Sequence, residues 1–368
     1  MILKKLSILH YKNIQQLEIL FSPKINCFFG NNGMGKTNLL DAIYYLSFCK
    51  SYMNTPDNQL IYHTEDMCVI QGNYDYDDHE EEVFCVIRRK QRKQFRRNKK
   101  EYEKLSEHIG LLPLVMVSPE DSRLIQGGSE ERRRFVDLII SQQDKAYLHA
   151  LIQYNKALLQ RNSMLRNQLV DEALYEALEV QLSRYGGLIY EKRQEMVNSF
   201  IPVFNAYYRT ICGSDGYESV DLCYVSQLAN EELREMLVRN RERDRILGYT
   251  SIGVHKDELE MKLNNSLIRR TGSQGQNKTY LTALKLAQFA FLDQKGQTLP
   301  ILLLDDIFDK LDAVRVEQII QLVGNSNFGQ IFITDTNRKY LDEILANMEQ
   351  DYALFKVDQG SIQSMENI

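Results

Sequence analysis

An eight-residue segment constrains this sequence more than any other feature. Residues 30–37 read Gly-Asn-Asn-Gly-Met-Gly-Lys-Thr and match the pattern G-x-x-x-x-G-K-[ST], whose glycines let backbone N–H groups converge on phosphate oxygens. The apolar run Ile25 to Phe29 precedes the segment, and apolar residues at helical spacing follow it between Leu39 and Leu46. The motif therefore lies between a predicted strand and a predicted helix, which is the context that nucleotide binding requires.

Each part of this segment has a chemical role. The N-terminus of the following helix adds the positive end of its dipole, Lys36 reaches the β and γ phosphates, and Thr37 ligates Mg²⁺. ATP and Mg²⁺ are therefore the expected cofactors. The residues expected to contact them here are Gly30, Asn31, Asn32, Gly33, Met34, Gly35, Lys36, Thr37 and Asn38.

A second motif lies far along the chain, where the apolar run 302–304 leads into Asp305 and Asp306. An apolar strand that ends in adjacent carboxylates is the Walker B pattern of P-loop ATPases. Asp305 is expected to join Thr37 in the Mg²⁺ shell, and Asp306 to orient or deprotonate the attacking water. Most ABC-like ATPases carry Glu at the second position, so the shorter Asp306 predicts slow hydrolysis.

Between these motifs lies the string Ser273-Gln274-Gly275-Gln276, just before a predicted helix. A Ser-x-Gly-Gln string at this place resembles the ABC signature, where Ser and a helix N-terminus of one subunit close on the γ-phosphate bound by another. An ordinary helix cap uses the same residues, and the position between the other two motifs is what favours the signature. Ser273 thus joins Lys36 and the two aspartates as an expected catalytic residue, with Gly275 and Gln276 expected beside the nucleotide.

Strand and helix patterns predict an α/β fold that is interrupted by an insert. Short strands are expected before residue 30, and a hairpin is expected around the turn-rich segment Tyr74 to Glu82. Proline is absent between Pro119 and Pro202 and leucines recur there at helical spacing, which predicts long antiparallel helices. The last third alternates helices with apolar strands of the kind buried on both faces.

The expected architecture is an ABC-type P-loop ATPase head, with a mixed sheet, helices on both sides of it and an antiparallel β subdomain. The head comprises residues 1–125 and 250–368, and an inserted helical lobe comprises residues 126–249. No apolar run approaches the roughly 20 residues that cross a bilayer, and no signal-peptide core is present, so a cytoplasmic location is expected. Six scattered cysteines without a C-x-x-C pair are expected to be reduced thiols and not metal ligands.

The formal net charge of −5 argues against a protein that coats nucleic acid by charge alone. Any DNA contact must be local, and one stretch concentrates basic residues around Phe95. A hairpin of this charge density could follow a phosphate backbone with little base specificity, and a solvated surface is the competing interpretation. The basic residues are Arg88, Arg89, Lys90, Arg92, Lys93, Arg96, Arg97, Lys99 and Lys100.

Two other polar strings allow both a functional and a structural interpretation. The run Arg132 to Arg134 opens the insert, where it could bind DNA phosphate, couple the lobe to the nucleotide, or form salt bridges along a helix. The string His255 to Asp257 invites comparison with a nucleophile and its base. No Ser or Cys nucleophile is implicated near it in sequence, so a structural role or a contact near the nucleotide is favoured.

Several strings resemble the RecF family, and together they cover essentially the whole chain. RecF proteins are similar in architecture to the ATPase heads of SMC proteins, with a short helical lobe in place of a long coiled coil. The strings include Tyr11 to Asn13, Lys36 to Leu40, Ala42 to Tyr44, Ser118 to Asp121, Glu131 to Phe135, Tyr154 to Asn162 and Gly253 to Asp257, besides the signature and the acidic strand end.

The resemblance implies a DNA-binding ATPase that forms a homodimer on ATP, hydrolyses it weakly with stimulation by DNA, and supports recombinational repair of gapped DNA by helping to load RecA. It implies duplex DNA or single-strand/double-strand junctions, RecO and RecR as partners, and it places Lys12 and Asn13 beside the nucleotide. Lys12 departs from the usual Arg and cannot form its planar fork. Asn277 and Lys278 stand where the family commonly has Gln-Arg, so contacts there are expected to differ.

Three further loops of such a head have candidates in this sequence. The D-loop analogue would be Asp309 to Asp312. The switch residue is one of Thr334, Asp335 and Thr336, and the Ser118 to Asp121 turn competes with Gln126 for the role of the Q-loop.

Other ATPases remain as alternatives, namely the nucleotide-binding subunit of another ABC-type machine and an overcoming-lysogeny-type P-loop ATPase. A transporter subunit is disfavoured because the insert is too long and no switch histidine follows Ile333. An ATP-dependent nuclease would need an added carboxylate domain, which is not expected here. A small-molecule P-loop kinase has no use for the Ser-x-Gly-Gln string.

Overall fold

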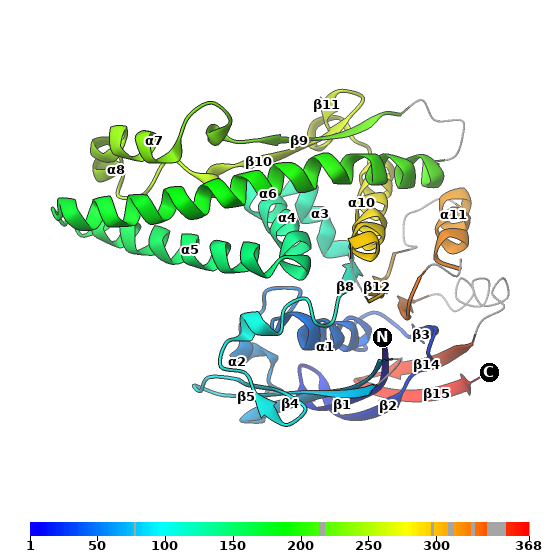
Figure 1. Ribbon diagram of the computed structural model, residues 1–368. Coiled ribbons are helices and arrows are strands. Elements are labelled where there is room, and N and C mark those ends of the chain that lie inside the picture. Colours follow the sequence, from blue (N-terminus) through cyan, green and yellow to red (C-terminus); the bar gives the residue numbers. More distant parts are fainter. Residues whose placement is uncertain are drawn as a thin grey trace. The chain divides into compact units, whose positions relative to one another are not determined.

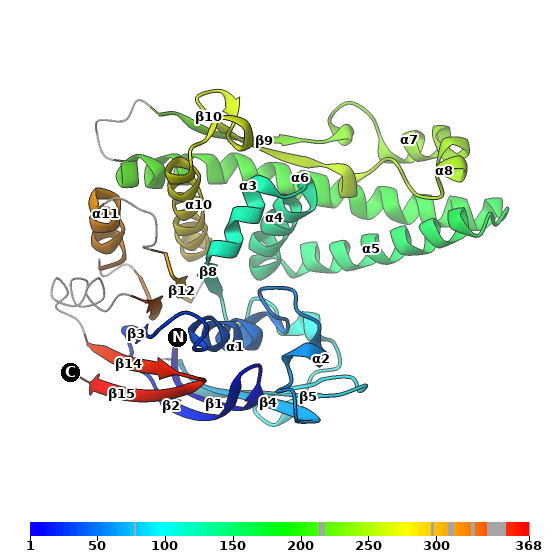
Figure 2. The same cartoon turned by 180° about the vertical axis from the view of Figure 1, so that it is seen from behind.

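The computed structural model describes residues 1–76, 79–212, 218–295, 298–307, 313–324, 328–336 and 351–367. Contacts within the chain divide it into two compact units, whose elements are labelled in Figure 1 and seen from behind in Figure 2. The head unit comprises Met1–Asp121, Thr210–Gly213 and Lys278–Ile368. The lobe unit comprises Ser122–Arg209 and Ser214–Asn277.

A six-stranded sheet forms the core of the head unit. Its order is β15-β14-β3-β13-β12-β8, and neighbouring strands are parallel except for β14 and β15. The apolar runs of the sequence supply the central strands, which read as continuous hydrophobic segments because both faces are covered. The strands are β3 (Ile25–Phe29), β8 (Leu114–Val117), β12 (Ile301–Asp305), β13 (Ile331–Asp335), β14 (Tyr352–Asp358) and β15 (Ser361–Asn367).

Helices cover this sheet from both sides. The helix α1 (Lys36–Phe48) contacts β8, β12 and β13, while α11 (Ala313–Gly324) and the head part of α10 (Gln274–Lys295) lie on the opposite side of the sheet in both ribbon views. The parallel strands all end at the edge where α1 begins. This edge is where open α/β sheets bind their ligands.

An antiparallel sheet forms the second layer of the head unit, on the far side of α1. Its order is β2-β1-β4-β5-β6-β7, and the pairing of Tyr76 with His79 confirms the expected hairpin. The side chain of Gln330 joins the two sheets, since its amide accepts from Leu3 N at 2.8 Å and donates to Leu3 O at 2.9 Å. The strands are β1 (Ile2–Tyr11), β2 (Ile14–Leu20), β4 (Met67–Tyr76), β5 (His79–Arg88), β6 (Gln94–Arg97) and β7 (Lys100–Glu101). The short helix α2 (Asp57–Leu60) precedes β4 in the chain, and the 3₁₀ turn η1 (Leu105–Glu107) follows β7.

Long helices dominate the lobe unit, as expected. The helices α5 and α6 run side by side in both ribbon views and are joined by a short connection. The helices are α3 (Ser122–Gln126), α4 (Ser129–Gln143), α5 (Lys145–Arg166), α6 (Glu172–Cys212), α7 (Leu233–Arg239), α8 (Arg241–Leu247) and α9 (Ile268–Thr271), with the 3₁₀ turns η3 (Gln227–Ala229) and η4 (Val254–Lys256).

The lobe unit also holds a small antiparallel sheet, which combines one strand inside the predicted helical insert with two strands from the last third of the chain. Its strands are β9 (Val220–Val225), β10 (Glu258–Leu263) and β11 (Ser266–Leu267), in the order β11-β10-β9. Because β10 pairs with β9, the compact unit continues to Asn277, beyond the expected boundary at residue 249. In the part of the chain that the structure describes, no helix is long and apolar enough to cross a bilayer.

Candidate nucleotide-binding site

The glycine-rich segment connects β3 to α1, as the sequence predicts, and we call residues 30–37 the phosphate loop. Gly33 and Gly35 have φ angles of 80° and 111°, a region that side chains with a Cβ rarely adopt. Gly35 caps α1 without a side-chain hydrogen bond, so the N–H groups of the first turn remain directed at the loop. A helix N-terminus with free N–H groups of this kind is suited to binding an anion such as phosphate.

The ammonium group of Lys36 lies inside this loop. Lys36 is 3% exposed, and its Nζ donates to Gly30 O at 2.7 Å and Asn31 O at 3.2 Å. Both acceptors are neutral carbonyls. A phosphate group would offer this ammonium a charged acceptor and therefore a stronger hydrogen bond.

The structure brings Thr37 and Asp305 together although 268 residues separate them in sequence. The hydroxyl of Thr37 lies 3.0 Å from both carboxylate oxygens of Asp305, and the hydroxyl of Thr334 donates to Asp305 Oδ1 at 2.7 Å. Burial raises the pKa of Asp305 to about 6, and the neighbouring Asp306 carboxylate adds to the rise. A hydroxyl and a buried carboxylate are hard oxygen ligands, and a cation would favour the ionised form of that carboxylate, so these residues fit Mg²⁺.

Asp306 follows directly after β12 with φ 45°, a left-handed conformation that is unfavourable for a residue with a side chain. Its N–H lies 3.2 Å from both the carbonyl and the hydroxyl oxygen of Thr334. Thr334, one of the three candidate switch residues, thus contacts both aspartates. The D-loop analogue, Asp309 to Asp312, lies outside the described residues.

The two candidates of the β1–β2 turn have different surroundings. Asn13 Nδ2 donates to Met34 O at 3.3 Å, and Asn13 Oδ1 accepts from Asn38 Nδ2 at 2.8 Å. The ammonium of Lys12 instead pairs with Asp41 Oδ2 at 2.6 Å. Lys12 therefore contacts α1 through an ion pair with a buried carboxylate.

Asp41 is a residue that the sequence patterns did not single out. It is fully buried, and its carboxylate also accepts hydrogen bonds from Tyr11 OH, Ser51 Oγ and Tyr52 N. A carboxylate within the apolar stretch 39–43 is a usable signal, because a buried charge requires a paired cation or several donors. The stretch alone does not name Lys12 as that cation.

Among the Q-loop candidates, Asp121 belongs to the head unit and Gln126 to the lobe unit. Asp121 ends the 3₁₀ turn η2 (Pro119–Asp121), accepts a hydrogen bond from Tyr52 OH, and pairs with Lys285 at 3.2 Å. This turn is therefore fixed to α10 within the head unit.

The signature string caps α10. Gln276 N donates to Ser273 Oγ at 3.2 Å and Ser273 N donates to Gln276 Oε1 at 2.8 Å, which are the reciprocal bonds of a capping box. Gln276 Nε2 also donates to Glu218 at 2.6 Å. Ser273 is exposed, so its hydroxyl remains accessible to a partner while it serves as the cap.

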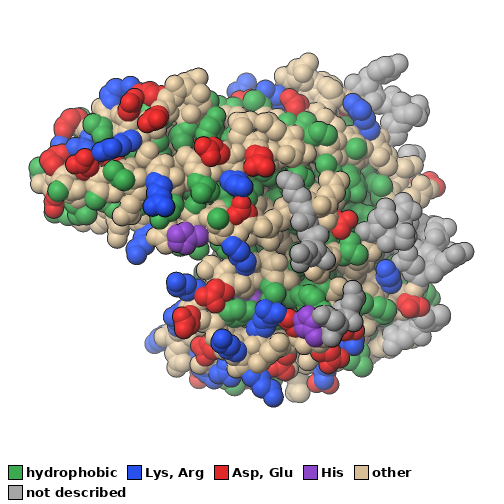
Figure 3. Space-filling view, in the orientation of Figure 1, with side chains coloured by type: hydrophobic (Ala, Val, Ile, Leu, Met, Phe, Trp, Pro, Cys, Tyr) green, Lys and Arg blue, Asp and Glu red, His purple; other side chains and the backbone are tan. Residues whose placement is uncertain are grey.

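The basic run divides into structural and exposed residues. Lys93 is largely covered and contacts Tyr45 OH at 2.9 Å and Asp57 at 3.1 Å, and Arg97 donates to the buried Glu81 at 2.6 Å. Over the antiparallel sheet, the face in Figure 3 shows basic side chains interspersed with acidic ones. The exposed members of the run are Lys90, Arg92, Lys99 and Lys100.

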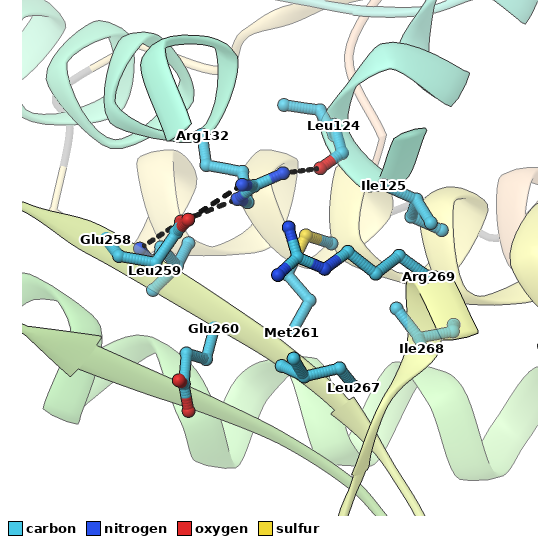
Figure 4. Close-up of a pocket in the computed structure, with 10 residues that line it drawn as sticks. All are labelled: Leu124, Ile125, Arg132, Glu258, Leu259, Glu260, Met261, Leu267, Ile268 and Arg269. Carbon is cyan, nitrogen blue, oxygen red and sulfur yellow. Dashed lines mark hydrogen bonds and ion pairs between the residues drawn. The ribbon is translucent and has the colours of Figure 1, made fainter. Parts of the chain in front are cut away.

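The arginines at the start of the insert have structural partners within the lobe unit. Arg132 is buried and forms a two-pronged ion pair with Glu258 at 2.6 and 2.8 Å, and its remaining nitrogen donates to Leu124 O and Gly127 O. Figure 4 shows this pair at one wall of a pocket of about 40 Å³ whose other lining residues are mainly apolar. The salt-bridged interpretation of this run therefore fits the structure.

The string His255 to Asp257 is likewise part of the lobe core. His255 contacts Tyr154 OH at 2.8 Å and Thr250 O at 3.0 Å, and burial lowers its pKa to about 4. Asp257 pairs with the buried Arg193 at 3.2 Å, while burial raises the pKa of its carboxyl. Both side chains therefore have partners that join elements of the lobe unit, which fits the structural interpretation.

The fold and this site define a P-loop ATPase head of the ABC and SMC class. A family model described as the RecF/RecN/SMC N terminal domain matches residues 2–363. A solved Smc head bound to the C-winged helix domain of ScpA has the same fold, with a TM-score of 0.60 and 15% identity over 100% of this chain and 98% of that chain.

More similar proteins narrow this class. The DNA replication and repair protein RecF of Parabacteroides distasonis is 72% identical over 100% of both chains, and that of Bacteroides thetaiotaomicron is 58% identical over 99% of both. A structure of the recombination mediator protein RecF with ATP, in the RecFOR pathway, has a TM-score of 0.89 and 26% identity over 99% of this chain and 98% of that chain. The chain belongs to the RecF family of DNA replication and repair proteins.

Proposed function

We propose that this chain is a recombination mediator that binds ATP and Mg²⁺ at the phosphate loop and hydrolyses the ATP slowly. The hydrogen bonds between Thr37 and Asp305, beside Lys36, are the observation that carries the proposal. They bring the two halves of a split nucleotide site together. The RecF structures with ATP and with ATPrS, at 26% and 27% identity, support the same ligand for this chain.

The residues of the head unit have separate tasks in this mechanism. The loop N–H groups and Lys36 bind the triphosphate, and Thr37 and Asp305 would hold Mg²⁺, which neutralises phosphate charge when bound. Asp306 orients the attacking water and accepts its proton. Thr334 fixes both aspartates through its hydroxyl and carbonyl oxygens.

Two copies complete the active site in this proposal. The exposed Ser273 and the N-terminus of α10 of one copy close on the γ-phosphate held by the other. DNA binds to the exposed basic residues 90, 92, 99 and 100 and stimulates hydrolysis, with RecO and RecR as further partners in the cytoplasm. The exposure of these four residues and the RecFOR pathway of the similar structures support this part.

Substitution of Lys36 tests the nucleotide site. Lys36→Arg should abolish ATP hydrolysis, because the planar guanidinium does not fit between the two loop carbonyls and the phosphates. Lys356→Arg, at an exposed position of β14, is the matched control and should hydrolyse ATP like the unmodified protein. Turnover of Lys36→Arg at the control's rate, measured by phosphate release with and without DNA, would remove the assignment of the phosphate loop.

A further inference from the structure

Two hairpin turns of the head unit meet the phosphate loop at Met34. In the turn between β14 and β15, Gly360 N lies 2.8 Å from Met34 O, and Gln359 N lies 3.4 Å from the Met34 sulfur. In the turn between β1 and β2, Asn13 Nδ2 lies 3.3 Å from the same Met34 carbonyl oxygen. One carbonyl of the loop thus accepts hydrogen bonds from two separate hairpins.

The packing between these turns and the loop leaves no room for added atoms. Gly360 has φ 79°, and a Cβ there would lie 2.3 Å from Asn13 O. A Cβ on Gly35 would lie 2.8 Å from Asn13 Nδ2, and one on Gly30 would lie 2.3 Å from Val357 O. Contacts this short are forbidden, so each glycine is a point where backbone must approach backbone or side chain closely.

Strand register explains why the C-terminal hairpin arrives at this place. The strand β14 runs parallel to β3, and Lys356 is paired with Phe29, the last residue before the phosphate loop. The turn after β14 therefore falls beside the loop. Asn13 extends the connection to the first turn of α1, because its Oδ1 accepts from Asn38 Nδ2 at 2.8 Å.

We infer that Asn13 and the Gln359–Gly360 turn are positioning residues that hold the phosphate loop in its binding conformation before the nucleotide arrives. They act on the Met34 carbonyl and need not touch the nucleotide. A loop that is already ordered loses less conformational entropy on binding, so affinity rises. The inference rests on the proposed nucleotide site and assigns part of its affinity to a turn that lies 325 positions from Met34 in sequence.

Nucleotide affinity and turnover separate this role from a merely stabilising one. Gly360→Ala should raise the Kd for a fluorescent ATP analogue with Mg²⁺ by roughly tenfold, because the added Cβ clashes with Asn13 O and displaces the turn whose N–H donates to Met34 O. The kcat at saturating ATP should change less than about twofold, because the bound phosphates themselves impose the loop conformation. Asn13→Ala should act in the same direction, and the double variant should fall short of the product of both effects, since both donors share one acceptor.

Gly248→Ala is the matched control. Gly248 has φ 74°, but the nearest atom to an added Cβ is a flexible arginine carbon at 3.8 Å, and the residue belongs to the lobe unit. This variant should lose thermal stability like Gly360→Ala and keep the unmodified Kd. If Gly360→Ala fails to fold, Asn13→Ala decides the question.

Three outcomes are distinguishable when Lys36→Ala is measured beside these variants. Weaker binding by Gly360→Ala and Asn13→Ala, with Gly248→Ala unchanged, supports the positioning role. Loss of binding in Lys36→Ala together with unmodified Kd values in both positioning variants overturns the inference and leaves the nucleotide site intact. An unmodified Kd in Lys36→Ala would overturn the nucleotide site itself.

Discussion

The buried carboxylate of Asp305 shows, at the scale of one residue, how the site conflicts with the stability of the head unit. Asp305 is 2% exposed, and its carboxylate accepts hydrogen bonds from the hydroxyl groups of Thr37 and Thr334. Hydroxyl groups do not fully replace hydration of a charge, which is why burial raises the pKa to about 6. The nucleotide-free head therefore binds the proton of Asp305 more tightly than an unfolded chain does.

This shift predicts a pH-dependent stability. The folded pKa of Asp305 lies above that of an unfolded aspartate, so the folded state binds the proton more tightly and loses stability as pH rises from about 4 to about 6. Asp305→Asn lacks this titration, and its stability relative to the unmodified protein should improve by about 2 kcal/mol between pH 4 and pH 7. Urea unfolding without nucleotide at both pH values measures the difference.

Asp66→Asn provides the comparison for this measurement, since the Asp66 side chain is fully exposed. This variant makes the same chemical change at an exposed carboxylate and leaves the contacts of Asp305 in place. Parallel pH curves for Asp305→Asn and the unmodified protein would contradict the assigned pKa.

At the scale of elements, the sequence predicted those segments whose backbone conformation requires particular residue types at fixed spacing. The phosphate loop and the acidic end of β12 were found because glycines and adjacent carboxylates appear at fixed spacing. The contact of Gly360 with Met34 depends on the register of β14 against β3, which no local pattern encodes. The pairing of β9 with β10 was missed for the same reason, since β9 is a short strand within the predicted helical insert and 32 residues separate Val225 from Glu258.

The basic hairpin shows how far a charge run can be interpreted without knowledge of its neighbours in space. The residue types correctly predicted that the run lies on consecutive strands. They did not show which of its cations face solvent. Lys93 pairs with Asp57, and Arg97 pairs with Glu81. Both carboxylates lie earlier in the chain, and no sequence pattern identifies them as the partners of these cations. A buried carboxylate such as Glu81 requires its arginine, so Arg97 is expected to contribute to folding and not to DNA affinity.

This division predicts different effects of two sets of substitutions on DNA binding. Replacing the four exposed residues Lys90, Arg92, Lys99 and Lys100 with Gln should weaken DNA binding and flatten the dependence of log Kd on log salt by roughly 0.9 for each phosphate that the protein no longer neutralises. Lys93→Gln and Arg97→Gln should lower thermal stability and leave that slope unchanged. Binding to a fluorescent duplex across a salt series gives both slopes, and an unchanged slope in the fourfold variant would identify the run as a solvated surface.

At the scale of the whole molecule, the proposed active site needs two copies of the chain, one that supplies its head unit and one that supplies Ser273. The phosphate loop and both aspartates belong to the head unit, while Ser273 belongs to the lobe unit and is exposed at the start of α10. An exposed hydroxyl in a capping box stabilises its own helix, and it can also serve as a phosphate ligand for a second copy. Dimerisation that depends on ATP follows from such an arrangement, because the triphosphate is then part of the interface.

Ser273→Arg tests this dependence. The bulky cation should block closure of two copies on the triphosphate, so the mass in solution should stay that of one chain at saturating slowly hydrolysed ATP analogue and Mg²⁺, while binding of the analogue by the single chain remains nearly unchanged. Ser266→Arg, at another exposed serine of the lobe unit, should dimerise like the unmodified protein. Light scattering measures the mass of each variant. Ser273→Ala removes the helix cap without adding a cation, and loss of the cap alone costs about 1 kcal/mol of stability. If Ser273→Arg dimerises as readily as Ser266→Arg, Ser273 is a helix cap and does not contact the triphosphate bound by a second copy.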